Sequence, residues 1–122
     1  MTSSTRTFLP LTTTEAFKAL LAESATGPVV VYKHSPTCGT SAQAYDELEG
    51  FLGESPVDVY LVDVLASRAL SQQIAADTRV RHESPQLLVF RNGVVVWHAS
   101  HWRVTAAAVR GVVEALAAAQ AQ

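Results

Sequence analysis

Residues 85–98, PQLLVFRNGVVVWH, limit the choice of fold more than any other part of the chain. Asn92-Gly93 accepts the positive φ angles of a tight turn, so the flanking apolar runs are predicted to form an antiparallel β-hairpin. Upstream, the β-branched runs VVVYKH, from Val29, and VDVYLVDV, from Val57, are separated by a helical pattern. A strand, a helix and a second strand imply a parallel pair with a right-handed crossover. The sheet is therefore predicted to be mixed.

Helical signals surround these strands. The capping-box pattern T-T-T-E predicts a first helix from near Thr12, which Gly27-Pro28 ends. Helical spacing of apolar residues predicts a second helix that ends at Gly53 and a third over residues 67–77. Thr105 is a good cap for an alanine-rich last helix. The predicted class is α/β, with a four-stranded mixed sheet flanked by helices in the order α-β-α-β-α-β-β-α, as a single domain over residues 1–122.

Composition and charge exclude several classes of function. The net charge is −2 with both signs scattered along the chain, which leaves no basic surface for nucleic acid or an anionic membrane. The N-terminal residues lack the apolar core of a secretory signal, and no apolar run approaches the ~20 residues of a membrane helix. A single cysteine suits a reducing compartment. We expect a cytoplasmic protein without nucleic-acid or membrane partners.

The one cysteine, Cys38, lies where the first strand meets the second helix. Thr37 is predicted to be the N-cap and Cys38 the first helical residue, where unpaired amides and the helix dipole favour a thiolate. Ser41, one turn further on, can donate a hydrogen bond to the sulfur. Lys33 and His34 lie just upstream on opposite faces of the strand. The alternative is a small buried hydrophobic residue, which most lone cysteines are.

Pro85 comes directly before the hairpin's first strand. Ser84 is therefore predicted to be extended, and the Ser84–Pro85 bond is a candidate for a cis peptide that leaves the Ser84 backbone groups exposed. The alternative is a proline at the first position of a strand, which sheets tolerate.

These features together resemble the thioredoxin superfamily from about Val29 to the end of the chain. The resemblance lies in the Cys-x-x-Ser helix start and in VRHESPQLLVFRNGVV. In that superfamily the first cysteine of Cys-x-x-Cys is the nucleophile, and here Ser41 replaces the second. The segments KHSPTCGTSAQAY and VVWHASHWRVT narrow the resemblance to the monothiol bacilliredoxin family, the YtxJ-type bacillithiol-system proteins. Those usually carry Thr-Cys-Pro-x-Ser, whereas this chain has Gly39, which loosens the first helical turn.

The resemblance implies a thioredoxin-like fold and a thiol-disulfide oxidoreductase that removes bacillithiol from protein mixed disulfides. Cys38 is expected to attack the disulfide between a client protein and bacillithiol, its co-substrate, and to keep the bacillithiol. Because the chain has no second cysteine, free bacillithiol or a partner reductase system must release it. The Ser84 backbone before Pro85 is expected to hold the extended substrate, and no tightly bound cofactor is expected. The residues expected to stabilise the thiolate are Thr37, Gly39, Thr40 and Ser41.

Other marked residues have simpler explanations. His98 and His101 do not form a recognised metal-ligand spacing, so no metal site is predicted. Trp97 and Trp102 are interpreted as core or surface packing at the end of the hairpin, against the alternative of a ligand box. Lys33, Arg81 and Arg103 are candidate contacts for the carboxylates of bacillithiol, against the alternative of ordinary solvated surface charges.

Two other functions stay open from the sequence. One thiol per chain plus a small thiol, doubled in a dimer, could hold a [2Fe–2S] cluster, as in monothiol glutaredoxins. The chain could also be a redox-silent binding module, because a fold does not fix a function.

Overall fold

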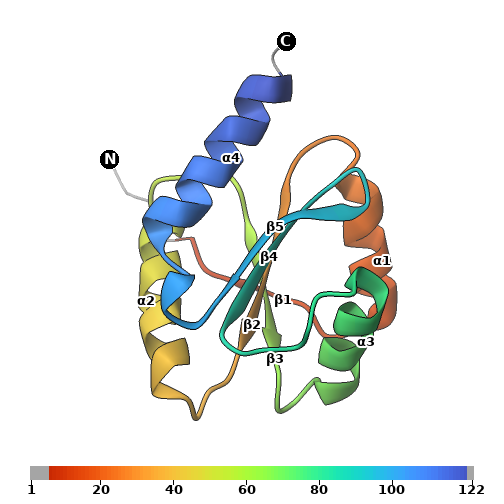
Figure 1. Cartoon of the computed structure of the whole chain (residues 1–122), viewed down its shortest axis with the longest axis vertical. Coiled ribbons are helices and arrows are strands. Elements are labelled where there is room, and N and C mark those ends of the chain that lie inside the picture. Colours follow the sequence, from red (N-terminus) through yellow and green to blue (C-terminus); the bar gives the residue numbers. More distant parts are fainter. Residues whose placement is uncertain (1–5, 121–122) are drawn as a thin grey trace.

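The computed structural model describes residues 6–120. Five strands form one sheet in the order β1-β3-β2-β4-β5 (Figure 1). The elements are β1 Leu9–Pro10, α1 Thr14–Glu23, β2 Val29–His34, α2 Gly39–Leu52, β3 Val59–Asp63, α3 Arg68–Thr78, β4 Gln86–Arg91, β5 Val94–Ser100, the 3₁₀ turn η1 His101–Arg103 and α4 Ala106–Gln120.

The centre of the sheet follows the predicted topology. β2 pairs with β3 in parallel and with β4 antiparallel, and β4 pairs with β5 antiparallel. The hairpin turn has φ of 55° at Asn92 and 80° at Gly93, as the Asn-Gly pair predicted. The mixed α/β architecture is therefore confirmed.

The sheet has five strands rather than the predicted four. Leu9 and Pro10 pair in parallel with Tyr60 and Leu61 of β3, and the Leu11 amide donates to the Leu61 carbonyl over 2.9 Å. Because β1 has only two residues and both are exposed, it has no alternating pattern from which a strand could be predicted.

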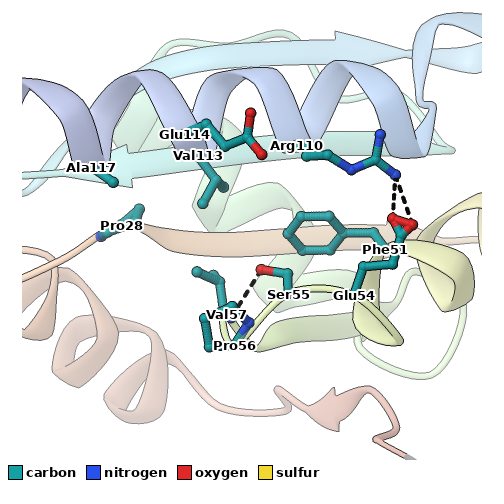
Figure 2. Close-up of a pocket in the computed structure, with 10 residues that line it drawn as sticks. All are labelled: Pro28, Phe51, Glu54, Ser55, Pro56, Val57, Arg110, Val113, Glu114 and Ala117. Carbon is teal, nitrogen blue, oxygen red and sulfur yellow. Dashed lines mark hydrogen bonds and ion pairs between the residues drawn. The ribbon is translucent and has the colours of Figure 1, made fainter.

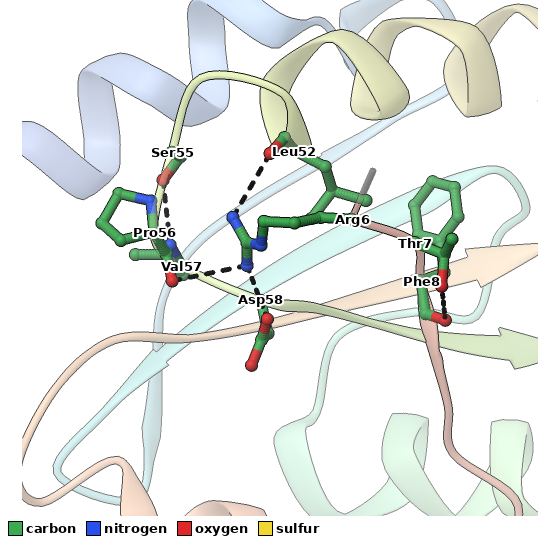
Figure 3. A network of polar contacts seen from close by, with 8 residues as sticks. All are labelled: Arg6, Thr7, Phe8, Leu52, Ser55, Pro56, Val57 and Asp58. Atoms are coloured by element: carbon green, nitrogen blue, oxygen red, sulfur yellow. Dashed lines mark hydrogen bonds and ion pairs between the residues drawn. The ribbon is translucent and has the colours of Figure 1, made fainter. Parts of the chain in front are cut away.

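Arg6 fixes the start of this segment. Its guanidinium donates to the carbonyls of Leu52, at 3.3 Å, and Pro56, at 3.4 Å, and forms an ion pair with Asp58 (Figure 3). The segment before β1 is thereby tied to the loop between α2 and β3.

Two apolar cores lie on the two faces of the sheet. α2 and α4 cover one face, and α1 and α3 cover the other (Figure 1). Alternation along β2 divides its side chains between the two cores: Val30 and Tyr32 face α2, while Val29 and Val31 face α1. His34 follows Tyr32 on the α2 face, and Lys33 takes the α3 face.

Two predicted helix starts are off by one residue. The N-cap of α1 is Thr13, whose hydroxyl accepts from the Ala16 amide over 3.1 Å, so the capping box expected between Thr12 and Glu15 does not form. The N-cap of α2 is Cys38 and not Thr37. At α1, adjacent threonines offer several equivalent caps, and Thr13, directly before the first helical residue, is the one used.

Candidate functional site

Cys38 lies at the junction between the end of β2 and the start of α2. The loop closes as a turn in which the Cys38 amide donates to the Ser35 carbonyl over 3.2 Å, with Pro36 at the second position. Cys38 is extended, with φ −107° and ψ 127°, and its carbonyl accepts the first helical bond from the Ala42 amide. The side chain is therefore half-exposed at the N-terminus of a 14-residue helix.

The environment of the sulfur favours the thiolate. The backbone amides of Ser41 and then of Thr40, in the first turn of α2, favour the charged sulfur and lower the pKa of the Cys38 thiol. Slight burial opposes this shift, and the hydroxyls of Ser41 and Thr40 lower the pKa further. The result is an accessible sulfur that ionises more readily than an ordinary cysteine.

The four residues expected around the thiol divide into two pairs. Thr40 and Ser41 are the two that lower the pKa of the thiol, and Ser41 is fully buried. Thr37 and Gly39 are exposed. Gly39 is the first helical residue, and Thr37 lies outside the helix rather than at its cap.

The Ser84–Pro85 peptide bond is cis. β2 and β4 pair up to Lys33 opposite Gln86. Continuing that antiparallel register sets Pro85 beside His34 and Ser84 beside Ser35, at the edge of the sheet where Cys38 begins α2. Ser84 is half-buried and Pro85 is buried.

The segment HASHW, residues 98–102, contacts the segment around Ser84–Pro85 through hydrogen bonds and an ion pair. The His101 amide donates to the Pro85 carbonyl over 2.9 Å, and the His101 ring lies 3.1 Å from the Glu83 carboxylate. The Gln86 amide group donates to the Ser100 hydroxyl over 3.3 Å. His101 itself has φ of 57°, so the chain turns sharply where it leaves β5.

Lys33 corrects the expectation of a surface charge. Its side chain is fully buried, with Nζ donating to the Ser71 carbonyl over 2.9 Å and lying 3.1 Å from Nδ1 of His82. Burial lowers the pKa of Lys33 to about 8. Lys33 thus contacts the loop before Pro85 from inside the α3 face, and it is not an exposed contact for carboxylates. Arg81 and Arg103 are exposed.

Aromatic residues beside the sulfur were missed by sequence reasoning. A shallow groove of about 250 Å³ runs from Cys38 past His34 and Tyr45. The Phe8 ring packs against Tyr45, with ring centroids 4.6 Å apart and the rings tilted by 44°. Tyr32 and His34, two residues apart on a strand, had to share a face, but only the packing of α2 sets Tyr45 against them.

The two tryptophans differ. Trp97 packs against the core on the α2 face, as expected. Trp102, in η1, is 63% exposed and lies on the surface. Among residues 6–120, no group of three or more histidine, cysteine, aspartate or glutamate side chains is arranged to hold a metal ion.

A separate apolar cavity of about 390 Å³ lies between α2, the start of β2 and α4 (Figure 2). Phe51 and Val113 form its walls, and the ion pair of Arg110 with Glu54, at 2.6 Å, crosses its rim. Pro28, at the start of β2, lines this cavity, whereas Cys38 follows the end of that strand. The cavity is therefore not part of the thiol site.

No described helix is both long and apolar enough to span a membrane.

Comparison with known proteins gives a family and a fold. The model of the family described as monothiol bacilliredoxin BrxC matches residues 9–109. A solved structure described as a candidate oxidoreductase with a thioredoxin fold is 38% identical, with a TM-score of 0.79, and the match covers 84% of this chain and 90% of that one.

Thioredoxins share the fold at lower identity. A mutant thioredoxin from Halobacterium salinarum is 19% identical over 95% of this chain and 96% of that one, with a TM-score of 0.73. A thioredoxin from Trypanosoma brucei brucei is 17% identical over 94% and 95%, also with a TM-score of 0.73. The predicted thioredoxin-like fold is confirmed, and the family and the 38% identical structure make this chain a thiol redox protein. By the match over residues 9–109, the chain belongs to the monothiol bacilliredoxin family.

Proposed function

We propose that this protein removes bacillithiol from mixed disulfides with client proteins, with Cys38 as the nucleophile. One observation carries the proposal: a half-exposed sulfur lies at the N-cap of α2, where the Ser41 and Thr40 amides lower its pKa. Family membership supports bacillithiol as the co-substrate. A lone thiol suits a reducing compartment, and the proposed place of action is the cytoplasm.

The reaction needs no external oxidant. The Cys38 thiolate attacks the bacillithiol sulfur of the mixed disulfide, a new disulfide forms between Cys38 and bacillithiol, and the client cysteine leaves as a thiolate that takes a proton from water. The chain has one cysteine, so a second thiol must then attack the adduct. That thiol is free bacillithiol or belongs to a partner reductase system.

The roles of the surrounding residues follow from their positions. Thr40 and Ser41 are proposed to stabilise the thiolate, Thr37 to shape the loop, and Gly39 to start the helix. The backbone of Ser84, beside the cis Pro85, is proposed to hold the extended client chain next to Cys38.

The experiment uses a client protein carrying one bacillithiol on a single cysteine, mixed with a stoichiometric amount of this protein. Intact-mass analysis is expected to show the client losing one bacillithiol and this protein gaining it. Cys38→Ser is the matched control and is expected to leave the client modified. The same client carrying glutathione tests the choice of small thiol. If the client loses bacillithiol no faster with wild type than with C38S, the proposal is refuted and a redox-silent role is left.

A further inference from the structure

His34 shares the groove beside the reactive sulfur. The residues that line this groove are His34, Pro36, Cys38, Ala42, Tyr45 and Asp46. His34 is the last residue of β2, is half-buried, and lines the groove together with Cys38. A molecule bound against Cys38 therefore meets an imidazole.

The imidazole is held in one orientation. The ring lies between two aromatic side chains, with centroids 5.4 Å from Tyr32 and 5.3 Å from Tyr45. Its Nδ1 is 2.7 Å from the Tyr32 hydroxyl. This packing leaves Nε2 as the ring nitrogen that can serve the groove.

The Tyr32 hydroxyl also selects the tautomer of His34. The hydroxyl has one hydrogen, and it donates to the Ser41 carbonyl over 3.0 Å. Burial raises the pKa of Tyr32, so the hydroxyl keeps that hydrogen. The hydroxyl oxygen then accepts from His34, whose proton lies on Nδ1 and whose Nε2 carries a lone pair. Tyr32 thereby joins the base to the same residue that stabilises the thiolate.

The surroundings keep this imidazole neutral near pH 7. Burial lowers the pKa of His34, and Asp63, its neighbour across β2 and β3, opposes that shift. The other titratable groups facing it are Tyr32 on β2, Cys38 in the loop, and Tyr45 and Asp46 on α2. A neutral imidazole is a proton acceptor.

We propose that Nε2 of His34 accepts the proton of the incoming thiol that releases the small thiol from Cys38. This role rests on the proposed exchange at Cys38. The chain has no second cysteine, so the releasing thiol comes from solution, mostly protonated. As its S–H bond breaks, the proton moves to Nε2, and its sulfur attacks the sulfur of the adduct. The two small thiols leave as a disulfide, Cys38 leaves as a thiolate, and the imidazolium returns its proton to water.

The acceleration that His34 can give to the attack of the releasing thiol has an upper limit. A thiol of ordinary pKa, about 8.5, is ionised to only about 3% near pH 7, so a base can accelerate attack by at most about thirtyfold. The gain disappears at about pH 9.5, where most of the thiol is already a thiolate. Loss of His34 therefore predicts a defect of about tenfold near pH 7 that closes as the pH rises.

The test measures release from a purified Cys38 adduct by excess small thiol, between about pH 6.5 and 9.5. His34→Asn keeps an N–H for the Tyr32 hydroxyl and removes the base, and His34→Gln is the second variant. His98→Asn is the matched control, because His98 is exposed on β5 and outside the groove. Alkylation of Cys38 against pH and thermal unfolding report on the thiol and the fold.

We expect both His34 variants to release the adduct about tenfold more slowly near pH 7 and at the wild-type rate at about pH 9.5, with an unchanged alkylation profile. A defect of equal size at every pH, no defect, or a shifted alkylation profile would overturn the proposal. Adducts of bacillithiol and of glutathione are both measured. If bacillithiol is not preferred but the pH-dependent defect persists with glutathione, the proposed function fails while the role of His34 stands.

Discussion

The backbone N–H of Ser35 donates to Oγ of Ser41 over 3.2 Å. This bond ties the residue after β2 to the first turn of α2, across the loop that carries Cys38. Because the Ser41 oxygen serves as the acceptor for Ser35, its own hydrogen is free to point at the sulfur. One buried hydroxyl thus both closes the loop and assists the thiolate.

Ser41→Ala is therefore expected to raise the pKa of the Cys38 thiol. The variant loses the hydroxyl donor but keeps the Ser41 and Thr40 amides, which contribute more to the shift. The measurement is the rate of alkylation by iodoacetamide against pH. We expect slower alkylation near pH 7 and the wild-type rate at high pH. Ser55→Ala, which removes a hydroxyl bonded to the Val57 amide at the other end of α2, is the control. A curve that does not move would show that the amides act without the hydroxyl.

Gly39→Pro is expected to stabilise the protein. Gly39 is the first residue of α2, where proline is favoured, and Cys38 before it is already extended. An added Cβ at Gly39 meets no atom within 4 Å. A compatible proline contributes about 0.4–1 kcal/mol by restricting the unfolded chain.

Chemical denaturation measures this gain in the free energy of unfolding. Gly50→Pro, in the interior of α2, is the contrasting variant and is expected to lose about 3 kcal/mol or more. A loss of stability in G39P would mean that the first turn of α2 differs from the one described here.

Lys33 is expected to give stability an unusual dependence on pH. Its folded-state pKa is about 8, against an ordinary value of 10.5. Between these values the unfolded chain binds more protons than the folded one, so the free energy of unfolding rises with pH. The full rise for this residue is about 3 kcal/mol, from the difference of about 2.5 pH units.

Lys33→Met, which cannot titrate, removes this contribution. Urea unfolding of wild type and K33M at about pH 7, 8, 9 and 10 measures the difference in free energy of unfolding. We expect the difference to move in favour of wild type as the pH rises through this range. A constant difference would contradict a lowered pKa. Lys18→Met, at an exposed position of α1, is the control.

Trp102 is expected to contact protein clients and not small thiols. It is 63% exposed and follows His101, whose amide holds the Pro85 carbonyl. Exposed tryptophans often anchor protein interfaces. Trp102→Ala is expected to lower kcat/KM for a modified client about tenfold, equivalent to ~1.4 kcal/mol, and to leave small disulfide substrates unaffected. Val94→Ala, exposed at the hairpin turn, is the control. An equal loss on both substrates would place Trp102 in the site itself.

Much of the fold could be predicted because local patterns and tertiary packing agree. Three elements are specified by local sequence: β2 by its β-branched run, the hairpin by the Asn92-Gly93 turn, and α4 by the side-chain cap of Thr105. The β1 strand could not be predicted, because its two exposed residues pair only once β3 is in place.

The site was predictable in part for the same reason. Cys38 at a strand-to-helix junction is a local feature, and so are its neighbours Thr40 and Ser41. The partners of His34 and Lys33 come from distant segments: Tyr45 reaches His34 from α2, and Ser71 and His82 reach Lys33 from α3 and the following loop. Alternation along β2 gave the two faces, but only the three-dimensional packing shows which cation is buried.

The choice of Cys38 itself as the N-cap has a consequence for the direction of exchange. The Thr40 and Ser41 amides, in the first turn of α2, favour the ionised sulfur of Cys38. A sulfur in a disulfide carries no charge, so adduct formation removes this stabilisation. The Cys38 adduct is therefore less stable than the reduced protein, and this difference in free energy favours release of the group that Cys38 carries.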